Sequence, residues 1–266
     1  MENERALPEI EIEGTSFLVD VKTNNLIEKD NPQNKLYLFD MDVNEQGYSF
    51  WYDKNERSFG PTAAPSDTNL FVTVAPLVEL DPEGMATKFG YTVEQIQGKT
   101  DYEVIVDQDA LALRSTGKLP TIDIAGHLFY VDYQMEMLRP EDDFGSNGIT
   151  FEDLDEFYSE ETNSCIVPYD PKSHETAAID YWSITTFPKD VIAVSIPTAR
   201  QMDPVAYSRE TGFDLKECLM EYGIRSEFKA EQIPWEKTGL VEDIKRNQAN
   251  KQVEKKQTGK KKGRGI

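Results

Sequence analysis

The sequence predicts an α+β fold made of two tandem homologous repeats, each a small, mostly antiparallel sheet covered by two short helices. Two observations predict this architecture. Residues 7–26 and 119–138 are identical at 9 of 20 aligned positions, where unrelated segments share about one. Within each copy, alternating apolar patterns come first and helix-capping signals come last.

The internal repeat sets the expected domain boundaries. The offset between matching residues grows from 112 to 122 along the chain, so the second copy carries small insertions of the kind that loops tolerate. Repeat 1 is expected over 6–104, a partly helical connector over 105–117, and repeat 2 over 118–228.

Each repeat is expected to open with a β-hairpin. In repeat 1, Ile10 and Ile12 alternate with other residues, as do Phe17 and Val19, and Gly14 lies between the two runs. Glycine accepts the positive φ that a tight hairpin turn requires. Further strands are predicted at 36–39, 48–52 and 70–74 in repeat 1, and at 149–151, 165–167 and 191–196 in repeat 2.

Capping residues mark two helices at the end of each repeat. In repeat 1, Asp81 can cap a helix that has Pro82 in its first turn and Gly90 at its end. A second helix is predicted from Thr92, because Gln95 stands at capping-box spacing. Repeat 2 carries corresponding residues at Asp203, Pro204, Gly212 and Asp214.

Composition excludes several classes of protein. The 266 residues are 38% apolar and 11% aromatic, too many for a wholly disordered acidic chain. No run of 18 apolar residues predicts a membrane span, and the first residues show no secretory signal. The two cysteines are too few for a disulfide scaffold and are typical of a reducing compartment, so a cytoplasmic location is expected.

Charge is unevenly distributed along the chain. The net charge is −21, but residues 244–266 hold nine basic side chains and one acid, so the first 243 residues carry −29. The basic tail has few apolar residues to bury and is expected to be disordered. A body this acidic repels phosphate backbones, so nucleic acid could be contacted only through the tail.

Neither the histidines nor the cysteines predict an active site. His127 and His174 have no counterparts in the other repeat and lack the spacing of a metal-protease motif, so both are expected at turns or on the surface. Cys165 and Cys218 occupy positions expected to face the core, where a thiol packs as a small hydrophobe. No cofactor motif is found, and no cofactor or metal is expected.

Several aspartates occur at equivalent places in both repeats. One interpretation is a carboxylate-based hydrolase, which requires two acids in one cleft with a raised pKa on one of them. The other interpretation is structural, with the acids accepting backbone hydrogen bonds at turns. Residues 40–47 also resemble the start of a calcium loop, but Glu45 and Trp51 replace the glycine and glutamate that such a loop needs. The repeated acids are Asp20, Asp132, Asp40, Asp153, Asp42 and Asp155.

Aromatic residues beside acids are candidate anchors for a protein partner. Trp51 and Tyr52 precede Asp53, and Trp182 follows Asp180 by two positions. Aromatic side chains are frequent at the centre of protein interfaces. The alternative is that these residues pack in the core as strand residues.

Residues 89–101, Phe-Gly-Tyr-Thr-Val-Glu-Gln-Ile-Gln-Gly-Lys-Thr-Asp, resemble the helical segment of PAS sensor domains. The resemblance covers about 30 residues and implies a small-ligand pocket, without a cofactor residue to carry over. Repeat 2 departs from the pattern, reading Met220-Glu-Tyr-Gly-Ile224 in place of the Gly-Lys-Thr-Asp turn.

The whole repeat, Leu-Pro-x-Ile-x-Ile-x-Gly followed by Phe-x-Val-Asp and the Asp-Pro helix, is similar to an uncharacterised family of proteins from gut Bacteroidota and their mobile elements. That resemblance implies no activity. The sequence favours a non-enzymatic binding protein whose acidic body engages a basic protein. The alternatives are a carboxylate hydrolase with converging acids, an acidic DNA mimic, and a ligand sensor with an enclosed apolar pocket beside the helix that begins at Thr92.

Overall fold

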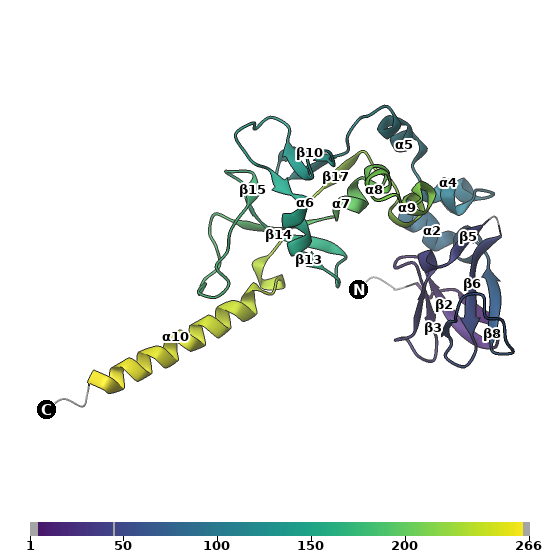
Figure 1. The fold of residues 1–266 in the computed structure, drawn as a ribbon, viewed down its shortest axis with the longest axis horizontal. Coiled ribbons are helices and arrows are strands. Elements are labelled where there is room, and N and C mark those ends of the chain that lie inside the picture. The colour runs from purple at the N-terminus through teal and green to yellow at the C-terminus, as the bar shows by residue number, and fades with distance from the viewer. Residues whose placement is uncertain (1–4, 45, 263–266) are drawn as a thin grey trace. The chain divides into compact units, whose positions relative to one another are not determined.

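The computed structural model describes residues 5–44 and 46–262, with side chains through residue 251. The chain forms two compact units. Figure 1 labels most of their helices and strands. Unit 1 contains the described residues up to 108 together with 214–223, and unit 2 contains 109–213 together with the described residues from 224 onward. Both units combine helices with mostly antiparallel sheets, which confirms the α+β class.

Unit 1 begins with a four-stranded antiparallel sheet in the order β1-β2-β3-β4. The predicted hairpin forms, and Gly14 takes φ +84° at its turn. Phe17 and Val19 lie on the inner face and are fully buried. The strands are β1 (Glu9–Ile12), β2 (Thr15–Asp20), β3 (Asn25–Glu28) and β4 (Lys35–Tyr37).

A second antiparallel sheet of unit 1 is centred on strand β6, and the 3-10 helix η1 (Leu38–Asp40) leads to it. The two sheets share one core, in which Phe17 and Tyr52 meet edge to face with ring centroids 6.2 Å apart. Gly47 starts β6 against the carbonyl of Val74, where a Cβ would collide. The strands are β5 (Asp42–Asn44), β6 (Gly47–Asp53), β7 (Ser58–Phe59) and β8 (Asn69–Val74).

Capping residues position the helices of unit 1 as predicted. The Asp81 carboxylate accepts a hydrogen bond from the Gly84 N–H, and Gly90 ends the helix with φ +75°. Thr92 and Gln95 form a reciprocal capping box at the next helix. The helices are α1 (Leu77–Leu80), α2 (Pro82–Phe89), α3 (Val93–Ile96), α4 (Asp101–Ile105) and α9 (Leu215–Tyr222).

Unit 2 also contains two sheets around one core. In its first sheet, β17 pairs in parallel with β9, while the other pairs are antiparallel. Phe129 and Tyr169 join the two sheets, with ring centroids 6.3 Å apart. The first sheet contains β9 (Thr121–Ile124), β10 (His127–Asp132), β11 (Met137–Pro140), β12 (Ile149–Thr150) and β17 (Glu227–Lys229); the second contains β13 (Tyr158–Ser159), β14 (Ser164–Asp170), β15 (Glu175–Thr176), β16 (Ile192–Ile196) and β18 (Glu231–Ile233).

The helices of unit 2 include the predicted helical part of the connector, α5 (Gln108–Ser115). Asp203 caps α8 (Pro204–Thr211) through the Ala206 N–H, and Gly212 ends this helix with φ +78°. The remaining helices are α6 (Phe151–Glu156), α7 (Ala199–Met202), the 3-10 helix η2 (Trp235–Lys237) and α10 (Leu240–Lys262).

Strand register recurs between the two units. Phe17 pairs with Ile10 and Glu28, and Phe129 pairs with Ile122 and Pro140, all at an offset of 112. Further along, Leu26 pairs with Leu36, as Leu138 pairs with Ile149. These parallels support the duplication, which stays a prediction about the origin of the chain.

Three features of the predicted repeats differ from the structure. Each unit has two sheets where one was predicted, because the strand patterns do not reveal which strands pair. Each unit also has more than two helices. The segment 214–223, expected in repeat 2, belongs to unit 1 through α9. Strands β17 and β18 extend unit 2 beyond residue 228, since both complete its sheets.

The tail predicted to be disordered over 244–266 is helical as far as Lys262, within α10. The first turns of α10 pack on unit 2, burying Leu240, Ile244 and Asn247. The Asn247 side-chain amide donates 2.9 Å hydrogen bonds to the carbonyls of Tyr181 and Ile184. Packing of this apolar and amide edge, which composition does not reveal, accounts for the difference.

Replacing Asn247 with alanine should lower the free energy of unfolding by about 1–2 kcal/mol, because two partly buried hydrogen bonds are lost and the Ile184 carbonyl loses this donor. Asn250→Ala on the exposed side of the same helix is the matched control. Urea unfolding followed by circular dichroism measures both variants. Equal stability of the two variants would contradict this packing of α10.

A buried ion pair anchors α5 to the start of α8 in unit 2. The Arg114 Nε lies 3.0 and 2.9 Å from the two carboxylate oxygens of Asp203, and both side chains are at most 9% exposed. Burial raises the pKa of the Asp203 carboxyl, while Arg114 and the Ala206 N–H oppose that shift. Unit 1 has a corresponding but more exposed pair between Arg5 and Asp81.

Arg114→Ala should lower the free energy of unfolding at pH 7 by about 3–5 kcal/mol, because it leaves a buried carboxylate without its cation. The loss should shrink as the pH falls, since protonation of Asp203 removes the unpaired charge. Denaturant unfolding at several pH values tests this, with Lys172→Ala, which removes an exposed ion pair with Asp190 in unit 2, as the control. A loss that is independent of pH would refute the assignment.

Candidate functional site: a pocket in unit 1

The repeated aspartates serve turns and helix ends. Asp20 accepts hydrogen bonds from the Lys22 N–H and the Thr23 hydroxyl, and Asp132 accepts from the Met135 N–H and from Arg139. Asp153 belongs to the capping box of α6. The segment around it is therefore helical, whereas the structural interpretation placed the repeated acids at turns.

The remaining repeated acids do not gather in a cleft. Asp40 ends η1, Asp42 begins β5 and Asp155 lies in α6, and all three are exposed. A pocket of about 410 Å³ in unit 2 is lined by three acids, Asp153, Glu156 and Glu175, of which only Asp153 belongs to the repeated aspartates. The convergence of acids that a hydrolase requires is not found among these residues.

The three candidate aromatic anchors have different environments. Tyr52 is fully buried in the core of unit 1, so the prediction that it binds a partner is wrong; its position in β6 directs it to the inner face. Trp51, the preceding residue, lies on the opposite face, where its ring is tilted against that of Phe71 with centroids 5.4 Å apart. Trp182 in unit 2 is 86% exposed, with the Arg246 guanidinium over its ring.

The two histidines lie together in unit 2. Their ring centroids are 3.9 Å apart, and His174 Nδ1 lies 2.9 Å from the Asp143 carboxylate. No sequence signal linked residues 47 positions apart.

Burial raises the pKa of the Cys165 thiol to about 11, which is consistent with the predicted packing role of this residue. Among the described side chains, no three His, Cys, Asp or Glu residues form a group that could hold a metal ion.

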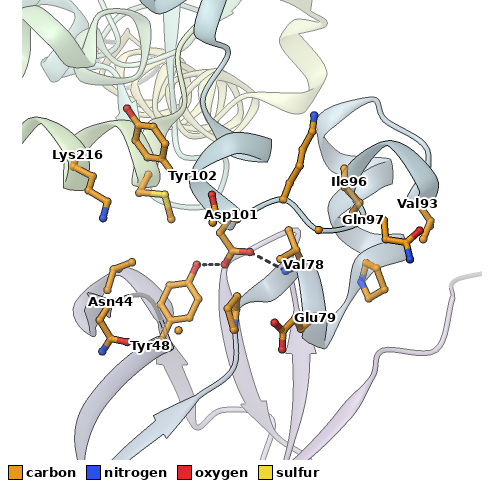
Figure 2. Close-up of a pocket in the computed structure, with 18 of the residues that line it drawn as sticks. Asn44, Tyr48, Val78, Glu79, Val93, Ile96, Gln97, Asp101, Tyr102 and Lys216 are labelled. Carbon is orange, nitrogen blue, oxygen red and sulfur yellow. Dashed lines mark hydrogen bonds between the residues drawn. The ribbon is translucent and has the colours of Figure 1, made fainter.

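Unit 1 contains a pocket of about 880 Å³ (Figure 2). Its walls come from the β5–β6 hairpin, the start of α1, the segment from α3 to α4, and α9. It lies beside the helix that begins at Thr92. The ligand-sensor alternative predicts an enclosed apolar pocket at this place. The apolar lining consists of Val43, Pro76, Val78, Pro82, Val93, Ile96 and Met220, with Tyr48 and Tyr102.

The Asp101 carboxylate joins three walls of this pocket. It accepts hydrogen bonds of 2.7 Å from the Tyr48 hydroxyl, 2.7 Å from the Leu77 N–H and 2.8 Å from the Val78 N–H. Pro76, which precedes α1, provides no side-chain cap, so Asp101 caps α1 from a distant segment. Figure 2 shows this carboxylate between Tyr48 and Val78.

Burial shifts the pKa values of both Asp101 and Tyr48. Burial raises the pKa of its carboxyl, although the hydrogen bonds from Tyr48, Val78 and Leu77 act in the opposite direction. The pKa of the Tyr48 hydroxyl is also raised, because that group is buried beside the acid. Since three donors already occupy the carboxylate, Asp101 is a structural acid and not a free general base.

Charged groups lie around the pocket. Lys99 extends over the ring of Tyr91, 5.1 Å from its centroid, and the exposed Lys216 stands on the side of Tyr48 and Asn44 (Figure 2). Glu79 and Glu94 provide carboxylates along the lining. Sequence reasoning missed Lys216 and Met220, because α9 reaches unit 1 from a segment more than 100 residues away.

Comparisons with known proteins return nothing similar: no family model, no curated protein and no solved structure matches the chain. No helix in the described part of the chain has the length and apolar content to cross a membrane.

Asp101→Ala should lower the free energy of unfolding by about 2–4 kcal/mol, because it leaves two N–H groups of α1 and the Tyr48 hydroxyl without an acceptor. Tyr48→Phe removes only one donor and should cost about 1 kcal/mol. Chemical denaturation of both variants measures the difference. Equal losses would rule out the cap on α1.

Proposed function

We propose that the protein is a non-enzymatic binding protein whose unit 1 pocket receives apolar side chains of a basic protein partner. The supporting observation is the combination of an apolar-lined pocket of about 880 Å³ with the net negative charge of the unit that contains it. Pockets of roughly 300–1,000 Å³ with mainly apolar walls are typical ligand sites. The pocket therefore provides volume, while the charge of the unit selects the partner.

Charge supports a cationic partner. Residues 1–108 and 214–223, the sequence of unit 1, contain 24 acidic and 9 basic side chains, a net charge of −15. Four of the basic side chains, Arg5, Lys29, Lys54 and Arg57, are already paired with acids in unit 1. A field of this sign attracts basic segments and repels acidic ones.

The enzyme alternative has less support, since Asp20, Asp132 and Asp153 serve turns and a cap and the other repeated acids are exposed and apart. Asp101 is occupied by three donors. The small-ligand sensor alternative uses the same pocket and differs in the occupant. Both alternatives are separated from the proposal by the chemistry of what binds.

The test uses two acetylated, amidated octapeptides with the same leucine positions and with lysine or glutamate at the others. The lysine peptide should bind, with affinity that falls as salt screens the attraction, and the glutamate peptide should not. Val93→Arg at the pocket wall, where the side chain is 39% exposed, should weaken binding at least tenfold by bulk and like charge. Calorimetry measures the dissociation constants.

Leu113→Arg in unit 2 is the matched control, because Leu113 is similarly exposed at 43%. Lys216→Glu should tighten binding severalfold, since it replaces a cation at the pocket, whereas Lys35→Glu at an exposed site of unit 1 outside the pocket lining should change it less. The proposal fails if the glutamate peptide binds equally well or if Val93→Arg behaves like Leu113→Arg.

A further inference from the structure

Strand β8 has an open edge. Its residues Asn69–Val74 pair with Asp53–Tyr48 of β6 along their whole length. Strands β5 and β7 share the other side of β6, and among the described strands β8 pairs with β6 alone. At the start of this edge Asn69 already exchanges hydrogen bonds with Ser66, so the open part of the edge lies at Phe71 and Thr73, whose backbone donors and acceptors point away from β6.

The sequence of β8, Asn-Leu-Phe-Val-Thr-Val, contains no charge and no proline. Natural edge strands are usually protected from unwanted pairing by lysine, by proline or by a bulge. β8 has none of these features and consists mainly of residues that favour strands. An unprotected edge of this kind is the structure that strand-adding partners use.

The outer face of this sheet combines aromatic rings with acids. Trp51 and Phe71 are directly opposite in the register, with ring centroids 5.4 Å apart and Phe71 55% exposed. Residues opposite or two apart along a strand share a face, which defines the outer face as Asp42, Asn44, Ser49, Trp51, Asp53, Ser58, Asn69, Phe71 and Thr73. It contains two aspartates and no lysine or arginine. Ser49 and Asn69 on this face are buried, and the Asn69 side-chain amide donates hydrogen bonds to the carbonyls of Pro61 and Ala64.

The inner positions of β8 leave the core open at its margin. Leu70 and Val72 are only partly buried, whereas Val74 is buried. A strand added beside β8 would place alternate side chains next to Leu70 and Val72, and the others beside Phe71 and Thr73. The first set would be apolar, and the second would lie beside the exposed ring of Phe71, which favours lysine or arginine.

We propose that the outer edge of β8 is a strand-addition site for an extended segment of a basic protein, in which apolar residues alternate with lysine or arginine. A second copy of this chain is a less suitable occupant, because it would bring two units of net charge −15 together. No residue of β8 lines the pocket, so the proposal does not depend on what the pocket binds.

The experiment uses a fluorescent peptide, Arg-Val-Lys-Val-Arg-Val-Lys, and the same peptide with alternate backbone nitrogens methylated. The methyl groups remove hydrogen-bond donors along one edge and keep the charge. Two methylated peptides are measured, one for each set of alternate nitrogens, because only one set faces β8. Fluorescence anisotropy should show binding of the unmethylated peptide, and at least tenfold weaker binding of the peptide whose methyl groups lie on the edge that pairs with β8.

Phe71→Lys should weaken binding of the unmethylated peptide at least tenfold, because it adds a cation at the edge. Phe144→Lys in unit 2, where the side chain is 92% exposed, is the matched control and should leave binding unchanged. Thermal melting of Phe71→Lys confirms that it folds. If it does not fold, the two methylated peptides still decide the question with the unaltered chain.

Binding that is insensitive to both methylation registers overturns strand addition. Binding that Phe71→Lys leaves intact places the site elsewhere. Dimers of the unaltered protein in sedimentation, lost with Phe71→Lys, would mean that a second copy occupies the edge, against the proposal. Val93→Arg separates the two hypotheses: it should weaken the leucine-lysine octapeptide and leave this strand peptide unaffected.

Discussion

The hydrogen bonds to the Asp101 carboxylate hold the unit 1 pocket together. They join the β6 strand, through Tyr48, to the first turn of α1, through Leu77 and Val78. Because Asp101 is also the first residue of α4, the same contact places the α3–α4 segment against both. The pocket walls come from segments far apart in the chain, so their arrangement depends on this single buried acid.

Side-chain alternation along β6 separates the core from the surface in unit 1. Tyr48, Phe50 and Tyr52 face inward and are buried, while Trp51 between them faces outward. One strand therefore provides the centre of the core, the donor to Asp101 and the aromatic ring beside Phe71. A shift of register by one residue would exchange these roles, so the core that fixes the register also fixes the outer aromatic pair.

Local sequence signals predicted the elements that depend on neighbours in the chain. The caps at Asp81, Thr92 and Asp203, the left-handed ends at Gly90 and Gly212, and the hairpin at Gly14 all formed where expected, because each involves residues within a few positions. The partly helical connector is another such element, present as α5. The aromatic candidates could not be sorted in this way, because exposure depends on which face a second sheet covers: Tyr52 is in the core, whereas Trp182 is exposed.

The class of fold, the helix boundaries set by caps and the acidic charge of the chain can be predicted from the sequence alone, because they follow from composition and short-range spacing. Four features emerge only from the folded structure. Helix α9 belongs to unit 1, and Asp101 caps α1 across 24 residues. His127 meets His174, and β8 lies at an open edge. The physical reason is the range of the interactions. Caps and turns form between near neighbours, whereas strand pairing and burial join segments whose separation in the sequence carries no signal of their contact.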